Sequence, residues 1–221
     1  MTVSSQGTYK NLIEMLDNSQ KRFADRPLFG TKRDGNYEWT TYEQFSKKVD
    51  DLRGGLASLG ISPGDKVAII SKNTEEWAVS AYATYGLCGQ HIPMYETQLA
   101  NEWEYIIRDC SAKVLLVSNP TVLKQTIDFP ERIESLEHVV LISGSSSNKV
   151  KTYDDLLKTG RENPVKAQQP ESDSPMGMIY TSGTTGDPKG VILSHRNIIF
   201  ECQAVLSLLG MTENDRSLAF L

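Results

Sequence analysis

The sequence predicts an α/β fold, with doubly wound sheets and flanking helices. Short apolar runs alternate along the chain with longer segments of helical periodicity. Runs such as residues 67–70 are apolar on both faces, as strands of a parallel sheet must be. Asp34 and Gly35 separate two short strand-like runs, which indicates a β-hairpin. Strands separated by helices imply right-handed crossovers between parallel strands.

The expected helices share apolar residues spaced three or four apart. They cover residues 9–24, 41–60, 74–86, 99–108, a segment after 120, and 197–209. The expected strands are short and rich in apolar or aromatic residues. They cover residues 28–32, 37–40, 67–70, 91–95, 114–117, 139–142, 176–180 and 191–193. Thr41 and Gln44 have the spacing of a capping box, and Asn73 or Thr74 can cap the third helix.

The segment 159–175 contains three prolines and predicts an extended connection between two parts of the chain. Residues 1–158 form the first part, an α/β subdomain with the early hairpin. Residues 176–221 form the second part, in which a strand, a glycine-rich loop, a strand and a helix open the next subdomain.

Composition narrows the possible partners. The 221 residues are 39% hydrophobic and carry a net charge of −5, so the chain can bury a core and lacks the basic surface that nucleic acids require. Cys88, Cys110 and Cys202 form an odd, widely spaced set, which indicates reduced thiols in a cytoplasmic protein. No apolar run approaches the length needed to span a bilayer, so we expect membrane contact to be peripheral or made by sequence outside this chain.

The loop at residues 181–190 has the composition of a phosphate-binding loop. Gly183, Gly186 and Gly190 allow backbone N–H groups to converge on phosphate oxygens. Lys189 adds a mobile positive charge. Hydroxyl groups add further hydrogen-bond donors and an oxygen for Mg²⁺, and they belong to Thr181, Ser182, Thr184 and Thr185.

Two other interpretations of this loop are weaker. A Walker loop has Ser or Thr after its lysine and leads into a helix, whereas Lys189 precedes Gly190 and a strand-like run. A flexible polar linker would explain a lone Gly-Ser-Thr cluster. It does not explain a Pro-Lys-Gly ending between two apolar strands.

Residues 180–191 resemble the signature of the adenylate-forming superfamily, which includes acyl-CoA synthetases, peptide-synthetase adenylation domains and luciferases. Upstream stretches resemble the long-chain fatty acyl-CoA synthetase branch, namely residues 40–42, 64–69, 73–77 and 93–95. The resemblance covers essentially the whole chain. It implies the N-terminal part of the large domain of such an enzyme, incomplete in these 221 residues.

The resemblance implies a two-step reaction with ATP, Mg²⁺, a fatty acid and coenzyme A. A carboxylate attacks the α-phosphate to give an acyl-adenylate and pyrophosphate, and a thiol then displaces AMP. Lys189 would offset charge on the departing pyrophosphate, and the Thr181 hydroxyl would help to place Mg²⁺. The residues expected to hold ATP are Thr181, Ser182, Gly183, Thr184, Thr185, Gly186, Lys189 and Gly190.

The chain departs from the family pattern because most of the site is missing. The adenine-binding segment, the Mg²⁺-ligating Glu, the ribose-binding Asp, the hinge and the late catalytic Lys are not in this sequence. We therefore expect an N-terminal fragment that is inactive alone. A coumarate, medium-chain or acyl-carrier-protein ligase remains an alternative parent. A non-catalytic nucleotide-binding module and a chain that does not fold alone also remain open.

The histidines are weak candidates for chemistry. His195 follows the last strand closely, but a histidine without an oriented carboxylate is weak evidence for a general base. A helix-entry or packing role is favoured there. His91 and His138 are too far apart in sequence to indicate a metal site.

Overall fold

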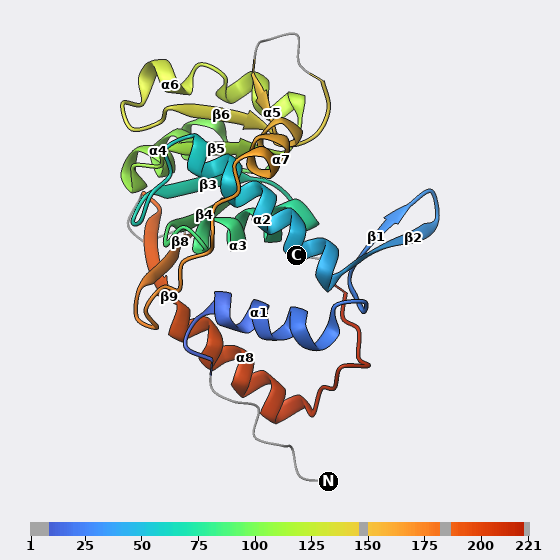
Figure 1. The fold of residues 1–221 in the computed structure, drawn as a ribbon. Helices are drawn as coiled ribbons and strands as arrows, with labels where there is room; N and C mark the ends of the chain where they lie inside the picture. Colours follow the sequence, from blue (N-terminus) through green and yellow to red (C-terminus); the bar gives the residue numbers. More distant parts are fainter. Residues whose placement is uncertain (1–8, 146–149, 182–186, 219–221) are drawn as a thin grey trace.

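A computed structural model describes residues 9–145, 150–181 and 187–218. Its centre is a seven-stranded sheet with the strand order β7-β6-β5-β3-β4-β8-β9. Helices cover both faces, and a separate two-stranded hairpin projects from one side (Figure 1). The strands β7, β6, β5, β3, β4 and β8 pair in parallel, and β9 alone in this sheet runs antiparallel to its neighbour. The doubly wound α/β prediction is confirmed.

The elements of the described residues follow in chain order. The strands are β1 (Pro27–Arg33), β2 (Asn36–Thr41), β3 (Lys66–Ile70), β4 (Gln90–Met94), β5 (Val114–Val117), β6 (His138–Leu141), β7 (Lys151–Thr152), β8 (Pro175–Thr181) and β9 (Lys189–Ser194). The helices are α1 (Leu12–Phe23), α2 (Tyr42–Ser58), α3 (Glu75–Tyr85), α4 (Ala100–Cys110), α5 (Pro120–Thr126), α6 (Phe129–Arg132), α7 (Tyr153–Glu162) and α8 (His195–Leu209).

The local signals in the first half of the chain form as expected. Asp34 and Gly35 both have positive φ, 47° and 86°, so they can make the tight turn between β1 and β2. Thr41 caps α2, because its hydroxyl accepts from the Gln44 N–H while the Gln44 side chain accepts from the Thr41 N–H. Of the two expected caps for α3, Thr74 is the one that forms.

The core consists of two apolar layers on opposite faces of the sheet. Successive residues of β3 face opposite sides, so Val67 and Ile69 pack with α2, α3 and α7. Ala68 and Ile70 pack with α4, α5 and α6. Each of these four side chains is fully buried. The parallel strands are therefore apolar on both faces because helices cover both.

The helix α7 and the short elements α6 and β7 were not foreseen. Thr152 and Asp155 form a capping box at the start of α7. The glycine Gly160 lets α7 cross α2 at close range, because a Cβ there would overlap the backbone oxygen of Asp51. The expected extended connection over 159–175 is wrong at both ends, because its first four residues complete α7 as far as Glu162 and Pro175 is the first residue of β8.

The last two strands continue the central sheet. Met176 of β8 and Ile199 of α8 belong to a third apolar cluster, together with residues of α1 and α3. The helices α1 and α8 lie on the same side of the molecule in Figure 1. A division into two subdomains around residues 159–175 stays a prediction, with β8 joined to the same sheet as β4.

Candidate functional site

The two strands that flank the glycine-rich loop form an antiparallel pair. In this pair Thr181 lies opposite Lys189, and Tyr180 lies opposite Gly190. Directly opposed residues of such a pair have Cβ atoms about 5 Å apart. The strands therefore bring Thr181 and Lys189 together where β8 ends and β9 begins. Five of the expected phosphate-binding residues lie outside the described residues, namely Ser182, Gly183, Thr184, Thr185 and Gly186.

The side chains of Thr181 and Lys189 are available for a ligand. Both residues are exposed. Within residues 9–145, 150–181 and 187–218, neither the Thr181 hydroxyl nor the Lys189 ammonium makes a hydrogen bond or an ion pair. A hydroxyl and an ammonium side by side are suitable groups to meet a triphosphate, one as a donor or metal ligand and the other as a charge.

The requirement for glycine at position 190 has a different cause from the one expected. Gly190 belongs to β9 and is not among the described glycines with positive φ. A Cβ at this position would lie 3.0 Å from Cζ of the Tyr180 ring and 3.2 Å from its hydroxyl oxygen. Gly190 therefore gives the Tyr180 ring room to cross the strand pair.

Tyr180 also links the strand pair to α4. Its phenol O–H donates to Oδ2 of Asp109 at 2.5 Å. Burial, and then the hydrogen bond to the Asp109 carboxylate, raise the pKa of Tyr180 well above its usual range. The phenol therefore stays protonated and remains a donor. Sequence reasoning missed this pair because nothing in the spacing of positions 109 and 180 indicates contact.

The element that follows the loop argues against a Walker-type site. In a Walker loop the lysine opens a helix. Here Lys189 is the first residue of the strand β9, which runs to Ser194. The prediction that a strand follows the loop is confirmed.

His195 has a packing role in this structure. It is 1% exposed, and its Nδ1 accepts the Leu12 N–H at 3.4 Å. Its ring meets Tyr85 edge to face, with the centroids 5.4 Å apart. Burial lowers the pKa of His195 to about 4. The neutral ring thus fixes the start of α1 to the start of α8.

His91 is likewise a buried structural group. Its Nε2 lies 3.0 Å from the Ser80 hydroxyl, and its ring packs edge to face on Trp77. Burial lowers the pKa of His91 to about 3. Among the described residues, no group of three His, Cys, Asp or Glu side chains could hold a metal ion. The described group that could offer an oxygen to Mg²⁺ beside the loop is the Thr181 hydroxyl.

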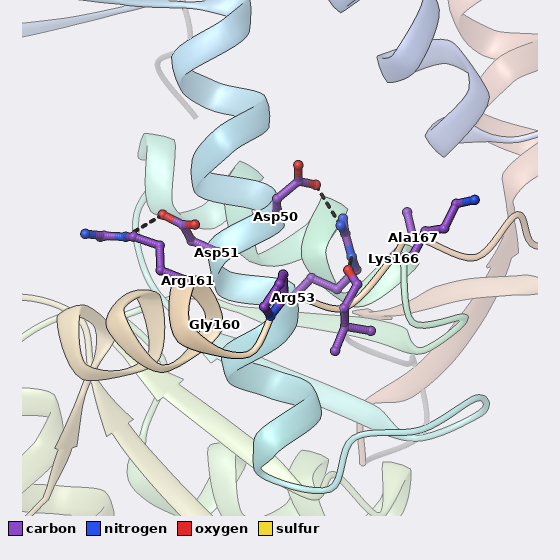
Figure 2. Close-up of a pocket in the computed structure, with 9 residues that line it drawn as sticks. Asp50, Asp51, Arg53, Gly160, Arg161, Lys166 and Ala167 are labelled. Atoms are coloured by element: carbon purple, nitrogen blue, oxygen red, sulfur yellow. Dashed lines mark hydrogen bonds and ion pairs between the residues drawn. The ribbon is translucent and has the colours of Figure 1, made fainter.

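A separate surface depression of about 470 Å³ lies between α2 and the segment after α7 (Figure 2). Its arginines are already paired. Arg53 binds Asp50 at 2.7 Å and donates to the Val165 carbonyl at 2.7 Å, and Arg161 binds Asp51 at 2.8 Å. The Arg161–Asp51 pair joins α7 to α2, and the Arg53–Val165 hydrogen bond joins α2 to the chain beyond α7, so the depression is a packing seam.

Comparison with known proteins identifies the family. The model of the family described as "AMP-binding enzyme" matches residues 16–221. The chain belongs to the AMP-binding enzyme family. The strand, loop and strand from Pro175 to Ser194 lie within this match.

Individual relatives agree with this assignment. The chain is 30% identical over 205 residues to fatty acyl-CoA synthetase A of Dictyostelium discoideum, covering 89% of this chain and 31% of the relative. It is 28% identical over 204 residues to long chain acyl-CoA synthetase 1 of Arabidopsis thaliana, covering 84% and 30%. The chain thus spans about a third of the length of the curated relatives it matches.

A solved structure has the same fold over most of the chain. An anthranilate CoA ligase in complex with anthranoyl-AMP superposes with a TM-score of 0.79 at 25% identity. The match covers 92% of this chain and 38% of that enzyme. In the described part of this chain, no helix is both long and apolar enough to cross a membrane.

Proposed function

We propose that this chain is the N-terminal part of an AMP-forming acid–thiol ligase that activates long-chain fatty acids. The single observation that carries the proposal is the Thr181–Lys189 pair, in which two opposed strand residues bring a hydroxyl and an ammonium group to the two ends of the glycine-rich loop. The names of the relatives in Dictyostelium discoideum and Arabidopsis thaliana support a fatty acid as the substrate.

In the first step a carboxylate oxygen of the acid bonds to the α-phosphorus of ATP, and the bond from that phosphorus to the bridging oxygen breaks. Pyrophosphate leaves with the bonding electrons. Lys189 would offset the negative charge that grows on this leaving group, which lowers the barrier without covalent chemistry. The Thr181 hydroxyl would orient the phosphates, with Mg²⁺ supplying further charge neutralisation when bound.

In the second step the sulfur of coenzyme A bonds to the acyl carbon and AMP departs, while the thiol proton is released. None of the described residues is assigned to this step. Another acid–thiol ligase of the family, specific for coumarate, a medium-chain acid or a carrier-protein thiol, remains the alternative parent. The three free cysteines fit the cytoplasmic location that belongs to the same proposal, with any membrane contact peripheral.

The test is ATP–pyrophosphate exchange by the complete protein that contains these residues, with a panel of fatty, aromatic and medium-chain acids. We expect exchange that depends on a long-chain acid. Hydrolysis of ATP to phosphate without any acid would contradict the proposal. For the chain by itself, calorimetry with MgATP separates a nucleotide-binding fragment, which binds without exchange, from one that does not bind.

A further inference from the structure

The β8–β9 hairpin is joined to the rest of the sheet along one side only. In the part of the chain that the structure describes, β4 and β8 share one register pair, His91 with Gly177. That pair lies four residues before Thr181. On the other side β9 is the last strand of the sheet. The position of Thr181 and Lys189 therefore depends on side chains that join the hairpin to the body of the protein.

Tyr180 supplies such a connection. Its hydroxyl donates to Asp109 in the last turn of α4, and its ring lies against Gly190 on the neighbouring strand. The ring and Met178 also pack at the edge of the apolar layer beneath α4. A single side chain thus contacts α4, β8 and β9, directly beside the pair that flanks the loop.

The Asp109 contact is the polar part of this connection. A hydrogen bond to a carboxylate is shorter and about twice as strong as one between neutral groups. The hydrogen bond is also directional, so it fixes the orientation of the Tyr180 ring. Gly190 contributes by leaving the space that the fixed ring occupies.

We propose that Asp109, acting through Tyr180, is a positioning residue that sets where Thr181 and Lys189 stand for phosphate binding. The inference rests on the proposed function of the loop. Asp109 does not itself touch the nucleotide. Its effect passes through the strand ends, where a displacement of about 1 Å is enough to reduce catalysis about a hundredfold in other enzymes.

The first experiment measures the strand ends without any ligand. Amide hydrogen exchange is followed by NMR at Thr181, Lys189 and Gly190. In Asp109→Ala and in Tyr180→Phe we expect the protected amides of this pair to exchange about tenfold faster, the factor that corresponds to one lost hydrogen bond to a charged group. Asp109→Asn keeps an acceptor and should restore slow exchange, within about threefold of the unmodified chain.

Asp173→Ala is the matched control. It removes another exposed carboxylate, the partner of Arg196 at 2.7 Å, at the opposite end of the same hairpin. It should leave exchange at Thr181 and Lys189 unchanged. Exchange that is equally slow in Asp109→Ala, Tyr180→Phe and the unmodified chain would overturn the inference.

The second experiment measures binding of pyrophosphate and of MgATP by calorimetry at pH 7. We expect Kd to rise about tenfold in Asp109→Ala and Tyr180→Phe, in protein that is still folded at the temperature of the measurement, and to stay within about threefold in Asp109→Asn and Asp173→Ala. Tight binding by the unmodified chain that Asp109→Ala leaves intact would overturn the positioning role and retain the proposed function. No binding of pyrophosphate or MgATP by the complete protein that contains these residues, with exchange as expected, would contradict the proposed function and retain the positioning effect of Asp109 on the strand ends.

Discussion

Gly177 lies against the main chain of His91 so closely that a Cβ at position 177 would overlap the His91 carbonyl oxygen. These two residues form the register pair through which β8 joins β4. Glycine is therefore required here for close approach of two strands, at a position without positive φ. The strand that leads to Thr181 is joined to β4 through this contact.

Gly177→Ala should separate β8 from β4. We expect a loss of about 1–3 kcal/mol in the free energy of unfolding, because the overlap involves backbone atoms that cannot rotate away. Urea unfolding at pH 7 checks the value. The control is Ile179→Val, two residues along the same strand at a 41% exposed position, which should change stability by less than about 0.5 kcal/mol. Equal stability of the two variants would contradict the close contact.

The crossing of α2 and α7 makes a similar prediction. A Cβ on Gly55 would overlap the main chain of Leu156, and one on Gly160 would overlap that of Asp51. Either substitution to alanine should cost about 1–3 kcal/mol or more, although alanine is a better helix former by about 1 kcal/mol. A rise in melting temperature, as propensity alone predicts, would show that the helices are further apart than described here.

The sequence predicts most strands and most helices because local chemistry determines them. Thr41 and Thr74 cap helices with their own side chains, and Asp34 and Gly35 turn the hairpin through their own backbone angles. Such signals require no knowledge of distant residues. The start of α7 carries the same kind of signal at Thr152 and Asp155, and it was missed because the prolines further on dominated the interpretation of that segment.

The candidate site also has some parts that the local sequence predicts and others that depend on distant residues. The loop could be recognised from its residues, and the strand after Lys189 could be expected from its apolar run. The Tyr180–Asp109 contact joins residues 71 positions apart, and no periodicity or propensity connects them. The reason why glycine is needed at position 190 could not be predicted either, because it depends on which side chain lies on the opposite strand.

The buried histidines predict a loss of stability in acid. Burial lowers the pKa of His91 to about 3 and that of His195 to about 4, from 6.5 when unfolded. Above pH 6.5 both histidines are neutral in the folded and in the unfolded chain, so they cause no loss of stability there. Below pH 6.5 these two histidines bind protons in the unfolded chain but not in the folded chain. The free energy of unfolding therefore falls as the pH approaches 4. The drop from 6.5 to about 4 corresponds to about 3 kcal/mol for His195.

Urea unfolding at pH 7, 5.5 and 4.5 measures this effect. His195→Leu removes one of the two groups, so the part of the slope that these histidines cause should fall to about half. Stability that is flat from pH 7 to 4.5 would show that neither ring is held neutral.

The described structure leaves large apolar side chains of α8 and β9 exposed. They include Ile192, Phe200, Leu206, Leu208 and Leu209, between 42% and 83% exposed. Apolar patches of this kind bind hydrophobic dyes and promote association. We expect the chain to bind anilinonaphthalene sulfonate while it is folded, and the double variant Phe200→Ser and Leu208→Ser to reduce the fluorescence severalfold at unchanged stability.

The control is Leu99→Ser, which changes an exposed leucine that immediately precedes α4. It should leave the fluorescence as it was. Dye binding that disappears only when the chain is unfolded would agree with the prediction. Dye binding that is absent from the folded chain would mean that these side chains are covered, for example by a second copy.

The role of Lys189 is the centre of the account. The measurement is acid-dependent ATP–pyrophosphate exchange by the complete protein that carries these residues, comparing Lys189→Ala with Lys166→Ala, a lysine beside the depression of Figure 2. Loss of one group that stabilises developing charge typically costs about a hundredfold to a thousandfold in rate. We expect a loss of that size in Lys189→Ala and a normal rate in Lys166→Ala. A normal rate in Lys189→Ala would contradict the account.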